Sequence, residues 1–474
     1  MGKTKNGITI EFLGMSSVEV TNSMYLIKFK NYQLLMDFGM YQSNNLLKDY
    51  RVNHRKIKGL DPKKLDYVMI SHLNGDHCAL LPFLYKNGCT APIILPSGSY
   101  ELLKIMLTDS SKIMLSDSLK LTNKYNIKAN PLYTEEDIEL CLDYIQEYDL
   151  NKTIELNDSI KFRLLSAGHI INSSQIYLEF KDGNLIRRVG YSGDVGSSIP
   201  KSYVEPIDKM PLVDILIGES TYANSAREHS IKDRYKDIEK LKTIIDTVCV
   251  DNKKKVLFPV FALDRLQTIL TSLYEIYGDD ENFTTKIIVD TPMGIKICNC
   301  YSDIVIKDKE LWNKVRNWKN IVWCQEYQDS KVLQEINEPQ ILCASSGMCT
   351  NGRSVAWLKK ILPDALNHVI FCGYSGELTL ASKVKEGKKN KTILIEKESI
   401  PNRAGTTTLH SYSSHACHKE LLNYYTTVEY NKLYLVHGNN ADKLIFAEEL
   451  QNELSKLNRT SRVICTNIDT VCNL

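Results

Sequence analysis

Two histidines and an aspartate lie close together in the segment Ser71–His77, directly after the apolar run Leu65–Ile70. An apolar run of this length, followed by a short segment that contains glycine, predicts a β-strand that ends in a tight loop. Imidazole nitrogens and carboxylate oxygens are ligands that zinc takes in proteins. The spacing therefore makes His72, Asp76 and His77 candidate ligands of a metal ion at the end of a strand.

The same residue types recur at the ends of other predicted strands. A single histidine or aspartate at such a position is usually a loop residue or a hydrogen-bonded core group. The chain contains only ten histidines, however, so their repeated occurrence after apolar runs favours one shared metal centre. The further candidate residues are Asp37, His169, Asp194 and His437.

Length and composition indicate a globular chain with two domains. A chain of 474 residues exceeds what one ordinary core contains. No apolar stretch is long enough to cross a bilayer and the N-terminus lacks the apolar core of a signal peptide, so no membrane partner is expected. The thirteen cysteines have no spacing framework and predict reduced thiols in a cytoplasmic protein. Cys298 and Cys300 have no second pair nearby and are expected to be structural.

Charge alone neither indicates nor excludes a nucleic-acid partner. The net charge is +2, and basic residues concentrate in Lys253–Lys255 and Lys383–Lys391. Such runs are usually solvated faces, although a local basic track is enough to bind RNA. Evidence for a partner therefore has to come from the motifs.

The motifs resemble those of the β-CASP branch of the metallo-β-lactamase superfamily, a group of RNA- and DNA-processing nucleases. The segment His72–His77 is similar to the superfamily signature His-x-His-x-Asp-His, with Asn74 at the position of the second histidine. The three additional motifs of the branch have counterparts in Ile217–Tyr222, Ser411–Ala416 and Val436–Gly438. Other similar stretches are Leu35–Gln42, Phe258–Leu263, Val289–Met293 and Ala344–Met348. The resemblance extends from about residue 8 to about residue 450.

This resemblance implies an α/β fold in which a metallo-β-lactamase αββα sandwich carries an inserted α/β β-CASP domain. We expect the sandwich to be assembled from residues 1–205 and 395–474, and the insert to comprise residues 206–394. Residues 110–160 have helical tendency and are expected to cover the first domain.

The sequence of the insert agrees with this organisation. Strand-like runs at residues 255–260 and 286–290 alternate with helical stretches such as residues 230–248. Alternation of this kind predicts a mostly parallel sheet.

The resemblance also implies a role for each candidate residue. A first metal ion would be held by His72, His169 and the altered position Asn74. A second would be held by Asp76, His77 and His437, with Asp194 bridging the two ions. The other implied catalytic residues are His415 as general acid, Glu219 as the group that orients it, and Asp37 as a carboxylate that positions a ligand histidine; Asp76 also counts as catalytic. Ser345 and Ser346 are candidate phosphate contacts.

The implied activity is hydrolysis of RNA phosphodiester bonds by a metal-activated hydroxide with a histidine general acid. A histidine at the position of His437 accompanies RNA-processing members of the family, and Ser345–Met348 is more similar to the endonuclease group than to ribonuclease J. We therefore expect an endoribonuclease that acts on single-stranded RNA and contains one or two zinc ions. An amide oxygen is a weaker zinc ligand than imidazole, so Asn74 should lower the affinity of the first site or shift it towards Mn²⁺.

Two other functions stay open at this stage. Asn74 is also compatible with a catalytically weakened paralogue that binds RNA or a partner subunit. A hydrolase of DNA or of a small phosphodiester is the third reading. Compact relatives in this family commonly form homodimers, which makes a homodimer the assembly to test.

Overall fold

The computed structural model describes residues 7–224, 226, 228–304, 307–373, 376, 379–387 and 391–474. Within these ranges the chain forms two compact units. The first unit consists of Met1–Ser198, Val204–Glu228 and His415–Leu474, and the second unit consists of Ile199–Tyr203 and His229–Ser414. The first unit is therefore assembled from segments that flank the second in sequence.

The unit boundaries differ from the predicted residues 205 and 394. Strand β11 (Val213–Glu219) pairs with two strands of the first unit, so the first unit continues to Glu228. Strand β19 (Gly405–Thr408) pairs in parallel with a strand of the second unit, so the chain returns to the first unit only at His415. Pairing between strands distant in sequence determined both boundaries, and local sequence composition does not report it.

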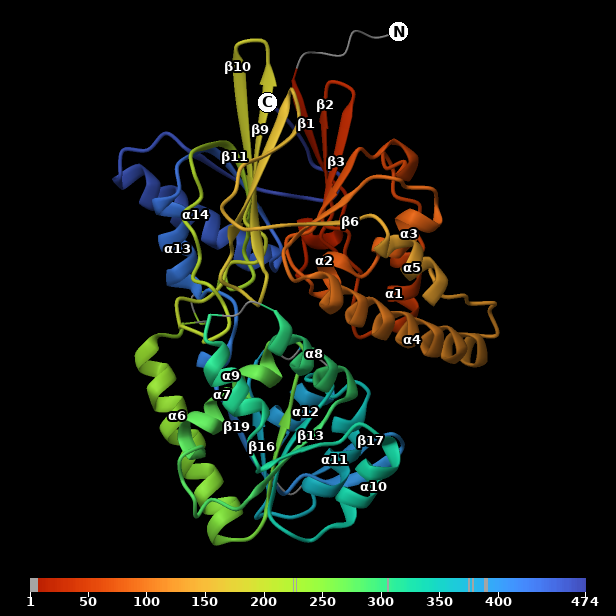
Figure 1. Ribbon diagram of the computed structural model, residues 1–474, viewed down its shortest axis with the longest axis vertical. Coiled ribbons are helices and arrows are strands. Elements are labelled where there is room, and N and C mark those ends of the chain that lie inside the picture. Colours follow the sequence, from red (N-terminus) through yellow and green to blue (C-terminus); the bar gives the residue numbers. More distant parts are fainter. Residues whose placement is uncertain are drawn as a thin grey trace. The chain divides into compact units, whose positions relative to one another are not determined.

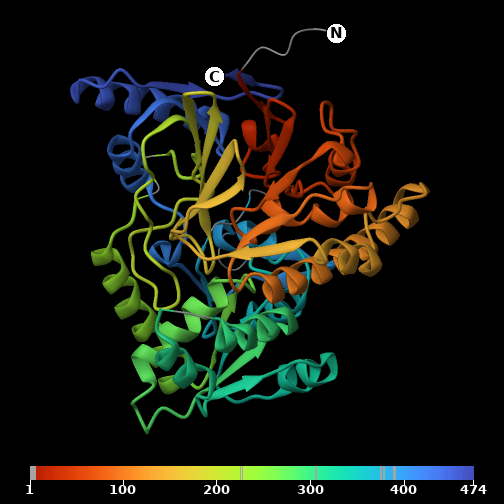
Figure 2. The same ribbon diagram turned by 45° about the horizontal axis from the view of Figure 1, so that its top comes forward.

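In the described part of the chain, the first unit contains two seven-stranded sheets. The order in the first sheet is β22 (Val471–Asn473), β1 (Ile8–Phe12), β2 (Tyr25–Phe29), β3 (Tyr32–Met36), β4 (Tyr67–Met69), β5 (Ile93–Pro96) and β6 (Ile145–Tyr148). The C-terminal strand β22 pairs antiparallel with β1, and in Figure 2 the blue C-terminal segment lies beside the red first strands.

The second sheet combines an antiparallel and a parallel half. Its order is β21 (Arg462–Cys465), β20 (Tyr430–Val436), β11, β10 (Leu185–Tyr191), β9 (Ser174–Asp182), β8 (Ile160–Ser166) and β7 (Ile154–Asn157). Strands β7 to β10 are antiparallel neighbours, whereas β10, β11, β20 and β21 run parallel. The carboxyl ends of the parallel strands consequently meet at one edge.

The two sheets pack face to face around an apolar core. Alternate residues of their strands point inward, as expected for a sheet with one face on the core. Phe29 of the first sheet and Phe180 of the second have ring centroids 5.1 Å apart, and Phe12 and Tyr434 have centroids 5.5 Å apart. These contacts lie in one buried cluster to which both sheets contribute.

Helices cover both outer faces of this sandwich, and Figure 1 shows the resulting layer order. On the second sheet, Leu421, Tyr425 and Phe446 pack with Leu216 and Leu433 in a separate buried cluster. The helices of the first unit are α1 (Leu46–Asn53), α2 (Gly75–Cys78), α3 (Leu81–Lys86), α4 (Tyr100–Tyr125), α5 (Glu135–Leu142), α13 (His418–Thr427) and α14 (Asn440–Lys456). The predicted αββα sandwich is confirmed. Of the residues 110–160 expected to be helical, part lies in α4 and α5, whereas β6 and β7 are strands within the same range.

The second unit contains a six-stranded sheet in which every described pair is parallel. Its order is β14 (Ile321–Trp323), β13 (Lys286–Asp290), β15 (Gln340–Ala344), β12 (Lys255–Pro259), β16 (His368–Phe371) and β19. A two-stranded hairpin is formed by β17 (Thr392–Ile395) and β18 (Glu398–Pro401). The predicted α/β insert with a mostly parallel sheet is therefore confirmed.

Helices alternate with these strands. Helix α6 begins where predicted, because the Ser230 hydroxyl accepts a hydrogen bond from the Asp233 amide at 3.3 Å, and it is followed by a π-helical turn over Asp246–Asp251. The helices of this unit are α6 (Ile231–Ile245), α7 (Arg265–Tyr277), α8 (Pro292–Asp303), α9 (Lys309–Arg316), α10 (Tyr327–Glu335), α11 (Arg353–Ile361) and α12 (Leu380–Glu386). On one face of the sheet, Trp357 and Leu358 pack against Leu257 and Leu342.

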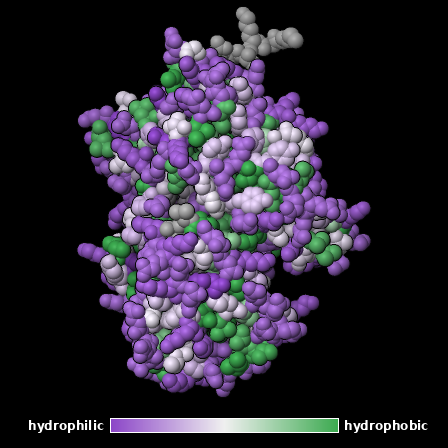
Figure 3. All heavy atoms as spheres, in the orientation of Figure 1, coloured by the Kyte–Doolittle hydropathy of each residue, from purple (hydrophilic) through white to green (hydrophobic). Residues whose placement is uncertain are grey.

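No helix among the described residues is long and apolar enough to span a membrane. On the face shown in Figure 3, hydrophobic residues form separate small groups among hydrophilic ones.

Cys298 is buried in α8, where its sulfur accepts a hydrogen bond from Gln267 at 3.3 Å. Within the basic run 383–391, Lys388, Lys389 and Asn390 lie outside the described residues.

Candidate metal centre

The loop after β4 places three of the candidate side chains in a single turn. Ile70 and Ser71 continue from β4, and the short helix α2 then carries Asp76 and His77. The backbone carbonyl of Asn74 accepts a hydrogen bond from the His77 amide at 2.9 Å, which starts the helix. Gly39, after β3, is needed beside it, because a Cβ there would lie 1.6 Å from the backbone oxygen of Asp76.

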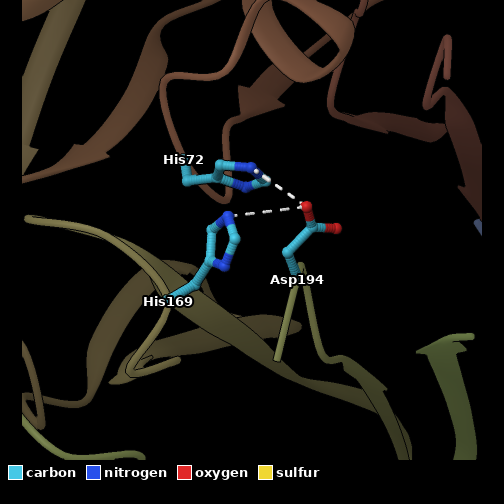
Figure 4. A group of neighbouring side chains, drawn as sticks. All are labelled: His72, His169 and Asp194. Atoms are coloured by element: carbon cyan, nitrogen blue, oxygen red, sulfur yellow. Dashed lines mark ion pairs between the residues drawn. The ribbon is translucent and has the colours of Figure 1, made fainter. Parts of the chain in front are cut away.

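A first group of ligand side chains comprises His72, His169 and Asp194. Their nearest ligand atoms all lie within 4.8 Å of one another, and all three residues are buried. Nε2 of His72 lies 3.5 Å from Oδ2 of Asp194, and Nε2 of His169 lies 3.8 Å from the same oxygen. Figure 4 shows both imidazoles pointing towards this carboxylate. Gly193, with φ +55°, makes the turn after β10 that precedes Asp194.

A second group comprises Asp76, His77 and His437. Nε2 of His437 lies 3.1 Å from Oδ2 of Asp76 and 3.4 Å from Nε2 of His77. His437 follows β20, and its backbone amide donates to the carbonyl of Ser16 at 2.6 Å. A side chain from the closing segment of the chain thus reaches the loop after β4.

Asp194 lies between the two groups. While Oδ2 faces His72 and His169, Oδ1 lies 3.4 Å from Nε2 of His77 and 3.4 Å from Nδ1 of His437. One carboxylate therefore reaches both groups, and all six predicted ligand residues are brought together in the first unit.

The donor atoms fit a divalent metal ion. Nε2 of His72 and Oδ1 of Asp194 are buried and have no hydrogen-bond partner within the described ranges of the chain. Buried polar atoms are normally satisfied, because an unpaired one costs about 1–3 kcal/mol. A set of imidazole nitrogens and carboxylate oxygens matches zinc, so an ion would satisfy atoms that the protein leaves open.

The electrostatic environment favours ligand forms in part of the site. Burial lowers the pKa of His72, and His77 lowers it further, which keeps this imidazole neutral. Burial would raise the pKa of Asp194, but His437, His77 and His72 hold it well below its ordinary value. Burial opposes protonation of His77 as well, yet Asp194, Asp76 and Asp37 raise its pKa to about 10. Metal binding must therefore displace a proton from His77.

Asn74 stands at the N-terminal end of α2, where the resemblance expects a histidine. The residue is half-buried, and its side chain makes no capping hydrogen bond to the helix. Each group consequently contains two imidazoles and one carboxylate, and the carboxylate of the first group, Asp194, also approaches the second group.

Asp37 accepts hydrogen bonds from several groups around the ligands. Its Oδ2 lies 2.7 Å from Nδ1 of His77 and accepts hydrogen bonds from the hydroxyls of Ser71 at 2.7 Å and Tyr191 at 2.6 Å. Its Oδ1 accepts the Ser71 backbone amide at 2.7 Å. The Ser71 hydroxyl also lies 3.0 Å from Nδ1 of His72. Ser71 and Tyr191 were not predicted from the sequence as residues of the site, although Ser71 directly precedes the candidate ligand His72.

His415 lies next to Asp194 and Glu219. Its Nδ1 is 3.5 Å from Oε1 of Glu219, and its Nε2 is 3.9 Å from Oδ2 of Asp194. The backbone bridge between His415 and Gly196 holds the residue beside the loop after β10. Burial would lower the pKa of His415, but the hydrogen bond with Glu219 and the charge of Asp194 outweigh it and raise this pKa.

Glu219 is buried at the end of β11 and is itself fixed by the backbone. Its Oε1 accepts the amide of Val195 at 2.9 Å, and its Oε2 accepts the amide of Thr221 at 2.7 Å. Thr221 was missed by the sequence analysis; its hydroxyl lies 3.0 Å from Nδ1 of His437.

Ser345 and Ser346 follow β15 in the second unit and are half-buried. The carbonyl of Ser345 accepts the amide of Ser354 at 2.7 Å, and the hydroxyl of Ser346 donates to the carbonyl of Asn351 at 3.2 Å. Their role as phosphate contacts stays a prediction.

Three family profiles match successive parts of the chain. The metallo-β-lactamase superfamily matches residues 18–152, the Beta-Casp domain matches residues 266–384, and the Zn-dependent metallo-hydrolase RNA specificity domain matches residues 399–460. The first match lies in the sandwich, the second lies in the insert, and the third covers the end of the insert and much of the returning segment that begins at His415.

Curated relatives are similar over most of the chain. Transcription termination factor FttA of Methanocaldococcus jannaschii is 27% identical over 95% of this chain and 70% of its own length. Ribonuclease TTHA0252 of Thermus thermophilus is 27% identical over 89% of this chain and 91% of its own length. Endoribonuclease YSH1 of Candida albicans is 24% identical over 90% of this chain and 48% of its own length. With its sandwich, parallel-sheet insert and clustered histidines, the chain belongs to the β-CASP branch of the metallo-β-lactamase superfamily.

Proposed function

We propose that this chain is a metal-dependent endoribonuclease that hydrolyses phosphodiester bonds in single-stranded RNA. The observation that carries the proposal is the position of Asp194, within 4 Å of both ligand groups and of His415. Candidate metal-binding side chains and a further histidine thus lie around one carboxylate. Two of the relatives are named ribonucleases, and the returning segment matches a domain described by RNA specificity, which supports RNA as the substrate.

The two ligand groups would hold zinc, one ion each, with Asp194 shared between them. When bound, the ions supply a water-derived nucleophile near neutral pH and offset negative charge on the phosphate. Asp37 orients His77 through its Nδ1, so that Nε2 faces the site. Tyr191 and Ser71 hold the Asp37 carboxylate in place.

His415 would donate a proton to the departing oxygen of the RNA. Its raised pKa favours the protonated imidazole that a general acid requires. Glu219, fixed by two backbone amides, holds Nδ1 and leaves Nε2 directed to the side of Asp194. The residue therefore acts on the substrate and not as a metal ligand.

Asn74 leaves the first group one imidazole short. We expect one tightly held ion at the second group and a weakly held ion at the first, with Mn²⁺ as the alternative occupant of the weak site. A slow nuclease follows from this arrangement, because the first group would hold its ion weakly.

A circular single-stranded RNA tests the proposal, since only an endonuclease opens a circle. The full chain with added Zn²⁺ or Mn²⁺ should linearise the circle, and His415→Ala should cleave about 10²–10⁴-fold more slowly while retaining its metal. A DNA circle of the same sequence and a small phosphodiester serve as controls. Faster cleavage of either control would assign the other substrate class, and no cleavage of RNA would refute the proposal.

A catalytically weakened RNA-binding protein is the second candidate, and Asn74 is the observation that favours it. Asn74→His separates the two functions. Restored cleavage with higher metal content identifies an enzyme silenced at one position, whereas RNA binding without cleavage in both proteins identifies a binding function.

We also propose a cytoplasmic location and a homodimer. The thirteen cysteines, all of them in the described ranges, form no disulfide, and eleven of them are buried, as expected in a reducing compartment. Light scattering of the purified chain measures the assembly directly.

A further inference from the structure

Arg265 is buried in the second unit with part of its guanidinium unpaired. It is the first residue of α7 and is 8% exposed. Its Nη2 donates to the hydroxyl of Ser414 at 3.2 Å. Its Nε and Nη1 are buried and have no hydrogen-bond partner among the residues that the structure describes. Since a buried cation needs a partner, two donors of this side chain await an acceptor.

The nearby carboxylate is already neutralised by another cation. Nζ of Lys201 donates to Oδ1 of Asp264 at 2.7 Å and to Oγ of Ser414 at 3.0 Å. Ser414 donates its own proton to Oδ2 of Asp264. Within the described ranges no carboxylate lies within ion-pair distance of Arg265, so Lys201, Asp264 and Arg265 together carry one excess positive charge.

Asp264 is held in a conformation that favours glycine, with φ +72°. The hydroxyl of Tyr203 donates to its carbonyl at 3.0 Å, and Lys201 and Ser414 bind its carboxylate. These contacts fix the conformation of Asp264, the residue that precedes Arg265. Strain of this kind persists when surrounding structure fixes it and is frequent at ligand sites.

Arg265 also lies where an open parallel sheet binds ligands. It follows β12, and the next strand of the sheet on that side is β16, which ends before Gly373. The chain leaves β12 towards β13 on one side and leaves β16 towards β19 on the other side. Carboxyl ends of neighbouring strands whose connections diverge form the ligand crevice of such sheets. A Cβ on Gly373 would lie 3.6 Å from Nε of Arg265, so Gly373 lies directly beside that atom.

We infer that Arg265, at the N-terminus of α7, binds a phosphate group of the RNA strand, an inference that rests on the proposed function. A guanidinium with two free donors matches the oxygens of a phosphate, and the positive end of the helix dipole adds to the attraction. Lys201 supports the site by its charge, and Asp264 fixes the start of the helix. The contact positions the strand without reading its sequence, because it involves the backbone alone.

The test compares Arg265→Gln with Arg316→Gln, which removes the same charge from the same unit. Arg316 is half-buried and donates to Asn299 at 3.1 Å, outside the cluster. Binding of a fluorescent single-stranded oligoribonucleotide is measured by anisotropy at several salt concentrations. Arg265→Gln should weaken binding about tenfold and lower the slope of log Kd against log salt by about 0.7, the value for one phosphate contact on a single strand. Arg316→Gln should change neither.

Replacing single phosphates of the oligonucleotide by methylphosphonates locates the contact. One position should weaken binding by the parent and leave binding by Arg265→Gln unchanged. Arg265→Lys keeps the positive charge but lacks the forked guanidinium, so it should have an intermediate RNA affinity. This variant replaces Arg265→Gln in the test if Arg265→Gln does not fold. If Arg265→Gln and Arg265→Lys have the same RNA affinity and the same salt slope as the parent, the inference is overturned. RNA cleavage by the parent would in that case still uphold the proposed function.

Inorganic phosphate distinguishes the source of the anion. If phosphate raises the thermal unfolding midpoint of the parent but not of Arg265→Gln while the parent binds no RNA, the anion is a free phosphate, and both the RNA assignment and the proposed function are refuted. If phosphate competes with RNA in the parent only, the inference is supported.

Discussion

Nδ1 of His77 lies 2.7 Å from Oδ2 of Asp37, and both side chains are fully buried. This contact is one of the links between the metal-binding loop and the body of the sandwich, beside backbone hydrogen bonds such as that from the Phe38 amide to the His77 carbonyl. Asp37 follows β3, His77 is carried by α2, and Tyr191 of β10 donates to the same carboxylate oxygen at 2.6 Å. One carboxylate therefore joins both sheets to a ligand histidine.

Asp37→Asn should weaken zinc binding about 10–100-fold, because the amide no longer holds His77 with its Nε2 towards the site. Competition with a zinc chelator gives the affinity. Tyr191→Phe keeps the carboxylate and removes one donor, so it is the matched control and should have the smaller effect. Equal zinc affinity in Asp37→Asn and the parent would show that Asp37 is only a structural carboxylate.

Asn74→His should increase the number of retained metal ions. The new imidazole would add a third nitrogen to the group of His72 and His169, which raises affinity for zinc. Elemental analysis after dialysis against a weak chelator measures the ion content, and the cleavage rate should rise with it. Two tightly retained zinc ions in the parent protein would contradict the expectation for Asn74.

The pH dependence of kcat/KM should report His415. A general acid must be protonated, so activity should persist above the ordinary histidine pKa of 6.5 and fall as pH rises through the raised pKa of His415. Glu219→Gln removes a charge that raises this pKa, so the fall should begin at lower pH. If kcat/KM of Glu219→Gln and of the parent falls over the same alkaline pH range, Glu219 does not influence the general acid His415. The metal content of both proteins is the control.

Gly39→Ala should destabilise the first unit by about 1–3 kcal/mol, the usual effect of forcing an extra methyl into a packed site. The added Cβ would lie 1.6 Å from the backbone oxygen of Asp76, so the loop after β4 must move. Gly75→Ala is the matched control, since its Cβ would meet nothing closer than 3.7 Å. Thermal unfolding of the two variants gives the difference, and equal midpoints would argue against tight packing of this loop.

The residue types of the metal centre and the class of fold could be predicted from the sequence by itself. His72, His169 and His437 could be selected because each follows an apolar run, and a run that ends in a ligand is a local feature. The parallel sheet of the second unit was likewise predictable, since alternation of strand-like and helical stretches is read along the chain. The similarity to β-CASP motifs followed from the same short segments.

Only the tertiary structure determined which of these side chains lie next to one another. Asp194 reaches both ligand groups because β10, β11 and β20 are successive strands of one sheet, and no single segment of the sequence specifies the strand order. The unit boundary at Glu228 has the same cause, because β11 joins the first unit by pairing with strands distant in sequence. The unpaired guanidinium of Arg265 could not be seen in the sequence either, because burial and missing partners depend on everything packed around a residue and not on its neighbours along the chain.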